Sequence, residues 1–260
     1  MIPKIIHYCW LSADPIPDSS VNYLSTWKTN LKDYEFMLWN FDRFDINSSI
    51  WVKESFESKK YAFSADYIRL YAIHTYGGFY MDLDVEVRTN YNLFTELNTM
   101  IGFEKEGKEG NRLEVGVFGA EKNAPWVKHC LLYYKDRPFK NHKGEFDTKM
   151  LPLVIKDILL ENEYELVPVS SVSEAREVDG GGELLIPVFG SEYFSPKSHS
   201  TGKIFVTDKT VCVHHFAGSW LPWVARAEIK LFHFLGIKNK YIFLRLNNIV
   251  LEYIKRFRAC

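Results

Sequence analysis

Residues 61–84 constrain the fold of this chain more than any other segment. Apolar side chains occupy most sides of a helix predicted over residues 61–76, which is typical of a buried helix. Gly77 and Gly78 predict its end, because glycine adopts the left-handed conformation that closes a helix. A short apolar strand is predicted over residues 79–81, and Asp82 and Asp84 follow it directly. The segment therefore predicts two carboxylates at the carboxyl end of a buried strand.

Short apolar segments alternate with helical patterns along the rest of the chain. This alternation favours an α/β fold with a mostly parallel sheet flanked by helices. Glycines 180–182 predict a flexible turn. Further strands are predicted at 4–10, 35–39, 114–120, 165–169, 184–188 and 211–216, and further helices at 18–31, 48–58 and 125–134.

Composition excludes several classes of partner and site. The formal net charge of −1 provides no global basic field for a nucleic acid. No apolar run approaches the roughly 20 residues that span a bilayer, and the first residues do not resemble a signal peptide, so we expect a cytoplasmic protein. The cysteines form no Cys-x-x-Cys pair and predict neither a disulfide framework nor a zinc cluster; they are Cys9, Cys130, Cys212 and Cys260.

Asp82 and Asp84 form the first candidate site. Residues two apart in an extended segment face the same side, so both carboxylates can point past the end of the strand. Open α/β sheets bind ligands at this edge. Two adjacent carboxylates repel each other unless a cation lies beside them, and Mn²⁺ or Mg²⁺ suits oxygen ligands. The alternative is a solvated loop that holds two acids.

Asp66 and Arg69 form the second candidate site. They are three residues apart on the predicted helix and can face the same side. One interpretation is an ordinary ion pair within the helix. The other is that Asp66 holds sugar hydroxyls while Arg69 binds phosphate or sugar. Because the surrounding helix is largely apolar, these charges are expected to face a polar pocket.

These motifs resemble a known family. Residues 64–84 resemble the sugar-binding region, with its Asp-x-Asp motif, of glycosyltransferase family 32. That family includes bacterial capsule-type transferases and yeast initiating mannosyltransferases, and it is related to the catalytic domains of large clostridial toxins. Residues 2–10 resemble the family's first strand, and residues 214–220 resemble a late family motif. Residues 97–209 match only loosely.

The resemblance implies a GT-A type, Rossmann-like fold and a metal-dependent, retaining glycosyltransferase. Such an enzyme moves a hexose from a nucleotide-diphosphate sugar to a glycan acceptor, with Mn²⁺ or Mg²⁺ as cofactor. UDP-galactose or UDP-glucose is favoured over GDP-mannose. Synthesis of capsular or surface polysaccharide is the expected setting. Since no enzymic nucleophile stands out, a same-face displacement is the expected route.

The resemblance also assigns roles to residues of this chain. Trp10 would stack on the nucleotide base, Asp84 would bind the metal, and Trp220 would close over the phosphate. His214 and His215 point to opposite faces of a strand, so at most one can reach the metal, and His215 is preferred. The implied catalytic residues are Asp66, Arg69, Asp82 and Asp84. The implied donor-binding residues are His7, Trp10, Asp66, Arg69, Tyr80, Asp82, Ser219 and Trp220, and the implied metal ligands are Asp82, Asp84 and His215.

Two departures from the family pattern leave alternatives open. Leu11, Ser12 and Ala13 follow Trp10 where relatives often carry glycines, so the role of this loop in donor contact is open. Residues 111–120 match poorly, and Glu114, which could contact the acceptor, is left outside the predicted site. A sugar-nucleotide-binding module without turnover and a metal-dependent nucleotidyltransferase or pyrophosphatase are the competing functions.

The end of the chain carries its own signal. A catalytic domain is predicted over residues 1–225, and a basic amphipathic helical segment over residues 226–260. Residues 238–258 hold six basic residues against one acid, with apolar residues at helical spacing. One interpretation is a helix packed on its own domain. The other is peripheral contact with the anionic inner face of a membrane, where a lipid-linked glycan acceptor would lie.

Overall fold

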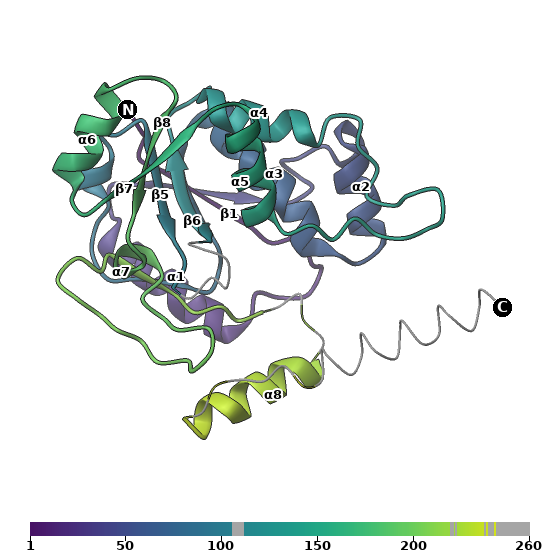
Figure 1. Ribbon diagram of the computed structural model, residues 1–260. Helices are drawn as coiled ribbons and strands as arrows, with labels where there is room; N and C mark the ends of the chain where they lie inside the picture. Colours follow the sequence, from purple (N-terminus) through teal and green to yellow (C-terminus); the bar gives the residue numbers. More distant parts are fainter. Residues whose placement is uncertain (106–111, 219–220, 222, 237, 239–241, 243–260) are drawn as a thin grey trace.

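The computed structural model describes residues 1–105, 112–218, 221, 223–236, 238 and 242. Its centre is a sheet whose strands β1, β5, β6, β7 and β8 are labelled in Figure 1. The full sheet has seven strands in the order β2-β1-β3-β6-β5-β8-β7, and a small second sheet pairs β4 with β9. The strands are β1 (Ile5–Cys9), β2 (Glu35–Trp39), β3 (Gly78–Met81), β4 (Val85–Val87), β5 (Thr99–Phe103), β6 (Leu113–Ala120), β7 (Glu165–Val169), β8 (Leu185–Phe189) and β9 (Cys212–His214).

Most neighbouring strands of the central sheet run parallel. The exception is β6, which runs antiparallel to both β3 and β5. The pairs β1–β2, β1–β3, β5–β8 and β7–β8 are parallel. The predicted fold class, a mostly parallel central sheet flanked by helices, is confirmed.

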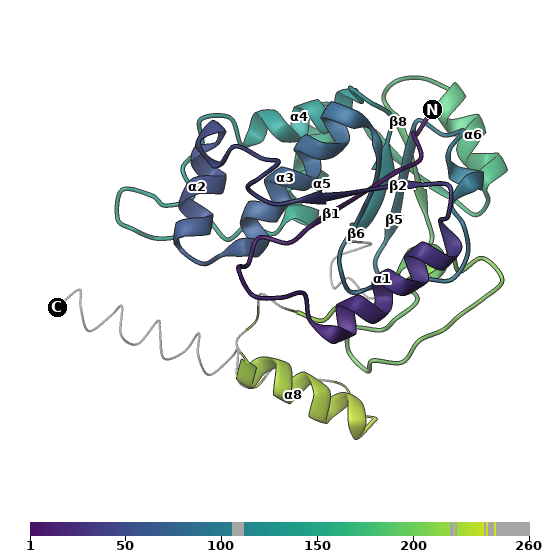
Figure 2. The same ribbon diagram turned by 180° about the vertical axis from the view of Figure 1, so that it is seen from behind.

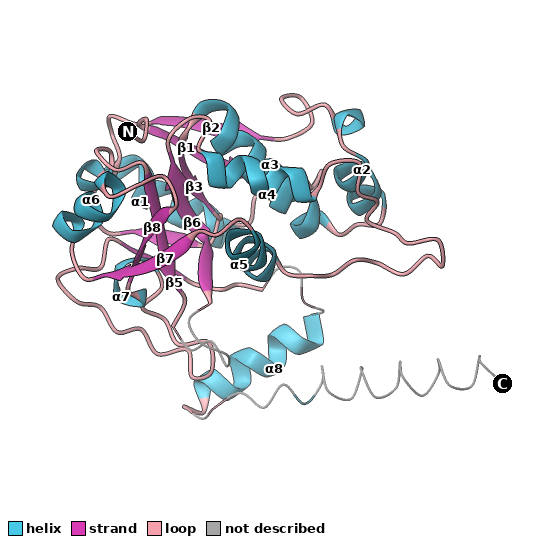
Figure 3. Cartoon of the chain, turned by 45° about the horizontal axis from the view of Figure 1, so that its top comes forward, coloured by secondary structure: helices cyan, strands magenta, loops and turns pink. Residues whose placement is uncertain are grey.

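Helices cover both faces of this sheet (Figures 2 and 3). One face packs against α1, α6 and α7, and the other packs against α3, α4 and α5. The helices are α1 (Asp18–Asn30), α2 (Ile50–Glu57), α3 (Tyr61–Tyr76), α4 (Pro125–Tyr133), α5 (Leu151–Glu161), α6 (Val172–Gly180), α7 (Ser191–Phe194) and α8 (Trp223–Phe234), with short 3₁₀ turns η1 (Ile46–Ser48) and η2 (Asn92–Phe94). No helix among the described residues is long and apolar enough to cross a membrane.

The segment singled out in the sequence folds as predicted. Helix α3 has the predicted bounds, and Gly77 ends it at φ +67°. Gly78 follows at φ +109°, where a Cβ atom would lie 2.6 Å from the Ile5 carbonyl oxygen. This close approach lets β3 pair with β1, which places the end of β3 beside the end of β1 at one edge of the sheet.

Other elements differ from the sequence pattern. The sequence pattern does not predict strands β4 and β5 or helices α5, α6 and α7. The turn predicted at glycines 180–182 begins too early, because α6 continues to Gly180. Ser171 caps α6 by accepting a hydrogen bond from the Glu174 N–H. The predicted domain boundary at residue 225 falls inside α8. Most of the predicted basic tail lies outside the described residues.

Candidate functional site

The two acids of the Asp-x-Asp motif lie in a turn. The Asp82 N–H donates to the Gly116 carbonyl at 2.8 Å, and the Val85 N–H donates back to the Asp82 carbonyl at 3.1 Å. The chain therefore turns between β3 and β4 instead of continuing as the extended strand assumed in the prediction. The turn nevertheless brings the carboxylates of Asp82 and Asp84 to one side.

A histidine from the far end of the chain joins these acids. Strand β9 pairs with β4 so that His214 lies opposite Val85. Its Nε2 lies 3.3 Å from Oδ1 of Asp84. One ligand atom from each of Asp82, Asp84 and His214 lies within 4.8 Å of the others. We call these three residues the acid–histidine cluster.

The structure corrects the preference for His215 over His214. The two side chains do point in different directions, as predicted, although His215 lies just beyond the end of β9. His215 directs Nε2 to Oε2 of Glu86 at 3.0 Å, and its ring stacks on Tyr23 with 4.7 Å between centroids. It is His214 that faces the carboxylates, because the pairing of β9 with β4 decides which side of the strand meets the turn.

Arg69 connects the helix motif to the acid–histidine cluster. Its guanidinium lies 3.3 Å from Asp66 and 3.4 Å from Asp82, and it donates to the Val115 carbonyl at 2.8 Å. It also lies over the Tyr80 ring, 4.5 Å from the centroid, and the Tyr80 hydroxyl donates to Asp82 at 2.9 Å. The pair is thus an ion pair within the helix and also part of a buried polar site. The ion pair and its polar surroundings are thus observed, and the binding of sugar or phosphate by these two residues stays a prediction.

Burial and charge shift the pKa values of the three carboxylates in different directions. Burial raises the pKa of Asp66 to about 6, although the Arg69 charge opposes the shift. Burial also raises the pKa of Asp82, again against Arg69. Burial acts to raise the pKa of Asp84 too, but the charge and hydrogen bond of His214 outweigh it and lower the value to about 2.

His214 carries the opposite charge. Burial acts to lower its pKa, yet the carboxylates of Glu114 and Asp84 raise it well above the usual value. The two carboxylates therefore favour the charged form of the imidazole. A proton here compensates charge that a bound cation could compensate instead.

The cluster has the chemistry for a divalent cation. Two carboxylates and one imidazole form a common donor set for such ions. The backbone of Gly116 lines the site without a side chain. A Cβ atom there would lie 2.4 Å from Cε1 of His214 and 3.0 Å from Oδ2 of Asp82. Glycine thus allows the His214 ring and the Asp82 carboxylate to lie close to the β6 backbone.

Glu114 belongs to this site and was not assigned to it from the sequence. Its side chain is fully buried and contacts His214. A signal was present in the sequence, because a single acid inside the apolar segment 113–120 must find a partner when it is buried. The sequence could not show that this partner lies 100 residues away.

The first strand contributes differently from the prediction. His7 has no exposed surface; it accepts from the Trp39 Nε1–H at 3.1 Å through Nδ1, so its Nε2–H donates to the Gly77 carbonyl at 2.8 Å. This corrects its assignment to the donor-binding residues, because both ring nitrogens are used inside the fold.

Trp10 is half-buried just beyond β1, and its indole N–H donates to the Asp14 carbonyl at 2.7 Å. Ser219 and Trp220 lie outside the described residues.

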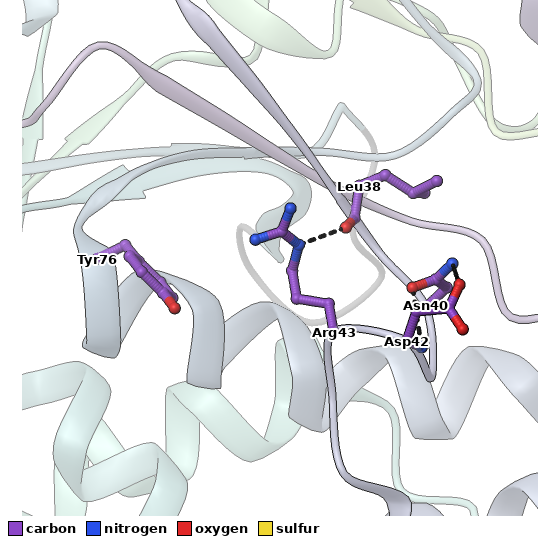
Figure 4. A pocket seen from close by; sticks show the side chains of 5 residues that line it. All are labelled: Leu38, Asn40, Asp42, Arg43 and Tyr76. Atoms are coloured by element: carbon purple, nitrogen blue, oxygen red, sulfur yellow. Dashed lines mark hydrogen bonds between the residues drawn. The ribbon is translucent and has the colours of Figure 1, made fainter.

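Two hollows in the described part of the chain lie away from the cluster. One has a volume of about 590 Å³ beside the edge strand β2 and is lined by Leu38, Asn40, Asp42, Arg43 and Tyr76 (Figure 4). Arg43 donates to the Leu38 carbonyl there at 2.9 Å. The other, of about 520 Å³, lies between α2, α3 and α4. None of the residues predicted for the site lines either hollow.

Comparisons with known proteins match the same segment. Residues 17–104 match the family described as a glycosyltransferase sugar-binding region containing a DXD motif. This range holds Asp66, Arg69, Asp82 and Asp84, and the resemblance predicted for it is confirmed. One curated relative is inositol phosphoceramide mannosyltransferase 3 of Schizosaccharomyces pombe (strain 972 / ATCC 24843). It is 34% identical over 88 residues, which make up 32% of this chain and 24% of that protein. The chain thus matches about a quarter of that relative's length.

Solved structures with a similar arrangement are distant in sequence. The PaToxG glycosyltransferase is 17% identical with a TM-score of 0.45, and the match covers 62% of this chain and 70% of that one. The galactosyltransferase LgtC, solved in complex with donor and acceptor sugar analogs, is 14% identical with a TM-score of 0.45 and coverage of 89% and 95%. A glycosyltransferase involved in glycosylation of the major capsid of PBCV-1 is 13% identical with a TM-score of 0.44 and coverage of 87% and 98%.

Proposed function

We propose that this chain, which carries a glycosyltransferase sugar-binding region at residues 17–104, transfers a hexose from a nucleotide-diphosphate sugar to a glycan acceptor. The observation that carries the proposal is the acid–histidine cluster. Asp82, Asp84 and His214 converge within 4.8 Å, next to the Arg69 guanidinium. A cation bound by this cluster, beside the Arg69 guanidinium, would place positive charge where a leaving diphosphate needs it.

The proposed cofactor is Mn²⁺, with Mg²⁺ as the alternative. A divalent cation at this position would supply charge that stabilises the departing nucleotide diphosphate. Asp82 and Asp84 provide the oxygen ligands that both ions accept. The imidazole of His214 favours Mn²⁺, because nitrogen ligands suit transition metals better than Mg²⁺.

Asp66 and Arg69 are proposed to hold the transferred sugar and its phosphate. The Arg69 guanidinium is fixed by Asp66, Asp82 and the Val115 carbonyl, so it is already oriented before a ligand binds. Orientation that requires no reorganisation is what makes such a charge effective in a transition state. We further propose retention of the anomeric configuration, which rests on the family resemblance and is tested by NMR of the product.

The proposed donors are UDP-galactose or UDP-glucose, with Trp10 stacking on the base. Trp10 lies just beyond β1, at the edge of the sheet where the carboxylates of Asp82 and Asp84 also lie. The yeast relative is named a mannosyltransferase, so GDP-mannose belongs in any donor panel.

The decisive experiment measures nucleotide release from this donor panel with Mn²⁺ and a glycan acceptor. Asp84→Asn should lower turnover by about 10²–10³-fold, because it removes a carboxylate ligand of the proposed cation that would stabilise the leaving group. The exposed Asp208→Asn is the matched control and should leave turnover unchanged. Donor binding without release would indicate a binding module. Release of pyrophosphate from a nucleoside triphosphate and a sugar phosphate would indicate a nucleotidyltransferase.

A cytoplasmic location on the inner face of a membrane, with a lipid-linked acceptor for capsular or surface polysaccharide, is proposed as the setting. The support is the basic, amphipathic pattern of residues 238–258. In liposome flotation, the full chain should rise with anionic vesicles and remain below with neutral ones. A chain that ends at residue 238 should not rise with either. Equal flotation of the two chains would contradict the proposed membrane contact.

A further inference from the structure

Glu114 occupies a buried position among apolar residues, where an ionised carboxylate is energetically unfavourable. It sits in β6 between Leu113, which is 0% exposed, and Val115, which is 8% exposed, and its own side chain is 0% exposed. A buried carboxylate without partners is strongly unfavourable, whereas one with several donors is tolerated. Its contacts therefore indicate what it does.

Three donors from separate places in the fold converge on this carboxylate. The His214 Nδ1–H lies 2.9 Å from Oε1 and 3.0 Å from Oε2. The Gly116 N–H donates to Oε1 at 2.6 Å, and the Ser195 hydroxyl donates to Oε2. Ser195 follows α7, and His214 ends β9, so Glu114 connects β6 to two later segments of the chain.

These contacts determine which nitrogen of His214 faces the acids. Because Nδ1 donates to Glu114, Nε2 is the nitrogen directed at Asp84, at 3.3 Å. The ring also lies close to Gly116, where a Cβ atom would lie 2.8 Å from Nδ1. Rotation of the ring about its bond to Cβ would break the contacts with Glu114.

We propose that Glu114 is a positioning residue that holds His214 in the Nδ1-protonated tautomer and in the ring orientation that offers Nε2 to a cation shared with Asp82 and Asp84. This inference rests on the proposed function, since it assumes a cation at the acid–histidine cluster. A histidine that binds a metal commonly donates its other N–H to a carboxylate, which fixes the tautomer and strengthens the ligand. Ser195 and Gly116 hold the carboxylate in turn.

The first test measures Mn²⁺ binding to the full chain, alone and with UDP, from the electron paramagnetic resonance signal of free Mn²⁺. Glu114→Gln preserves the shape of the side chain but removes its charge. Loss of an outer carboxylate typically weakens metal binding about 10–100-fold, and we expect a rise in the Mn²⁺ dissociation constant within that range. Glu57→Gln makes the same chemical change at an exposed position on α2 and should bind as the wild type does. Circular dichroism confirms that each variant is folded.

The outcomes separate this inference from the proposed function. Loss of binding in Asp84→Asn together with wild-type affinity in folded Glu114→Gln would overturn the role of Glu114 and leave the metal site standing. Wild-type affinity in Asp84→Asn would overturn both.

A second measurement needs no variant. Long-range ¹H–¹⁵N spectra of the wild-type protein with Mg²⁺ and UDP report which nitrogen of His214 holds the proton. We expect protonation at Nδ1 and none at Nε2. Protonation at Nε2 alone would refute the proposed orientation even if Glu114→Gln did not fold.

Discussion

At the scale of the residue, charge compensation organises the site. Burial raises the pKa of Asp82, while His214 holds the pKa of Asp84 at about 2. In the absence of a cation, the protonated imidazole compensates part of the negative charge. A cation that uses Nε2 must displace that proton, so the proposed Mn²⁺ affinity should increase as pH rises.

Variants of the two adjacent histidines test whether Mn²⁺ binding depends on His214, as the structure indicates, or on His215, as the sequence pattern predicts. His214→Gln should weaken Mn²⁺ binding at least about tenfold, because it removes the nitrogen that faces Asp84. His215→Gln should leave binding unchanged, since that ring contacts Glu86 and Tyr23. Calorimetric titration with Mn²⁺ and UDP measures both. A loss confined to His215→Gln would restore the preference predicted from the sequence.

At the scale of the element, the junction between α3 and β3 places the site. Helix α3 carries Arg69 on a buried face, and two glycines then reverse the chain so that β3 returns alongside it. The Asp-x-Asp turn begins where β3 ends. The distance between Arg69 and Asp82 is therefore a consequence of how closely β3 approaches β1 and α3.

Substitutions of glycine test this junction. Gly78→Ala should lower the free energy of unfolding by about 2–4 kcal/mol, because φ is +109° and the new Cβ would lie 2.6 Å from a carbonyl oxygen. Gly180→Ala, at the end of α6, meets nothing within 4 Å and should change stability by less than about 1 kcal/mol. Urea unfolding measures both values. Similar losses of unfolding free energy in the two variants would show that the close approach of β3 to β1 does not make Gly78 more important for stability than Gly180.

At the scale of the whole molecule, packing on both faces of the sheet gathers residues that are far apart in the chain. The acid–histidine cluster and its partner Glu114 come from the turn after β3, from β6 and from β9. The antiparallel strand β6 lies beside β3 and brings Gly116 next to Asp82. The small β4–β9 sheet adds His214.

The buried His7 should make global stability depend on pH. Burial lowers its pKa to about 4 from 6.5, although the Gly77 carbonyl opposes the shift. The unfolded chain then binds more protons between these values, so the stabilisation is present above pH 6.5 and is lost as pH falls to 4. The free energy of unfolding of the wild type should fall by about 3 kcal/mol more than that of His7→Gln over this window.

Denaturant unfolding at a series of pH values measures this difference, and only the slopes are compared, so a constant loss of stability in the variant does not matter. Parallel slopes would show that His7 does not titrate with folding.

The sequence by itself determined the α/β class and the bounds of α3, β2 and β7, and it singled out Asp66, Arg69, Asp82 and Asp84 as site candidates whose roles stay predictions. These follow from local periodicity, from glycine at a chain reversal and from charges in apolar surroundings, which are visible within a short window. The tertiary structure decided the rest. It selected His214 over His215, buried His7 within the fold and placed Glu114 behind the histidine, because strand pairing and contacts across 100 residues determine which side chains meet.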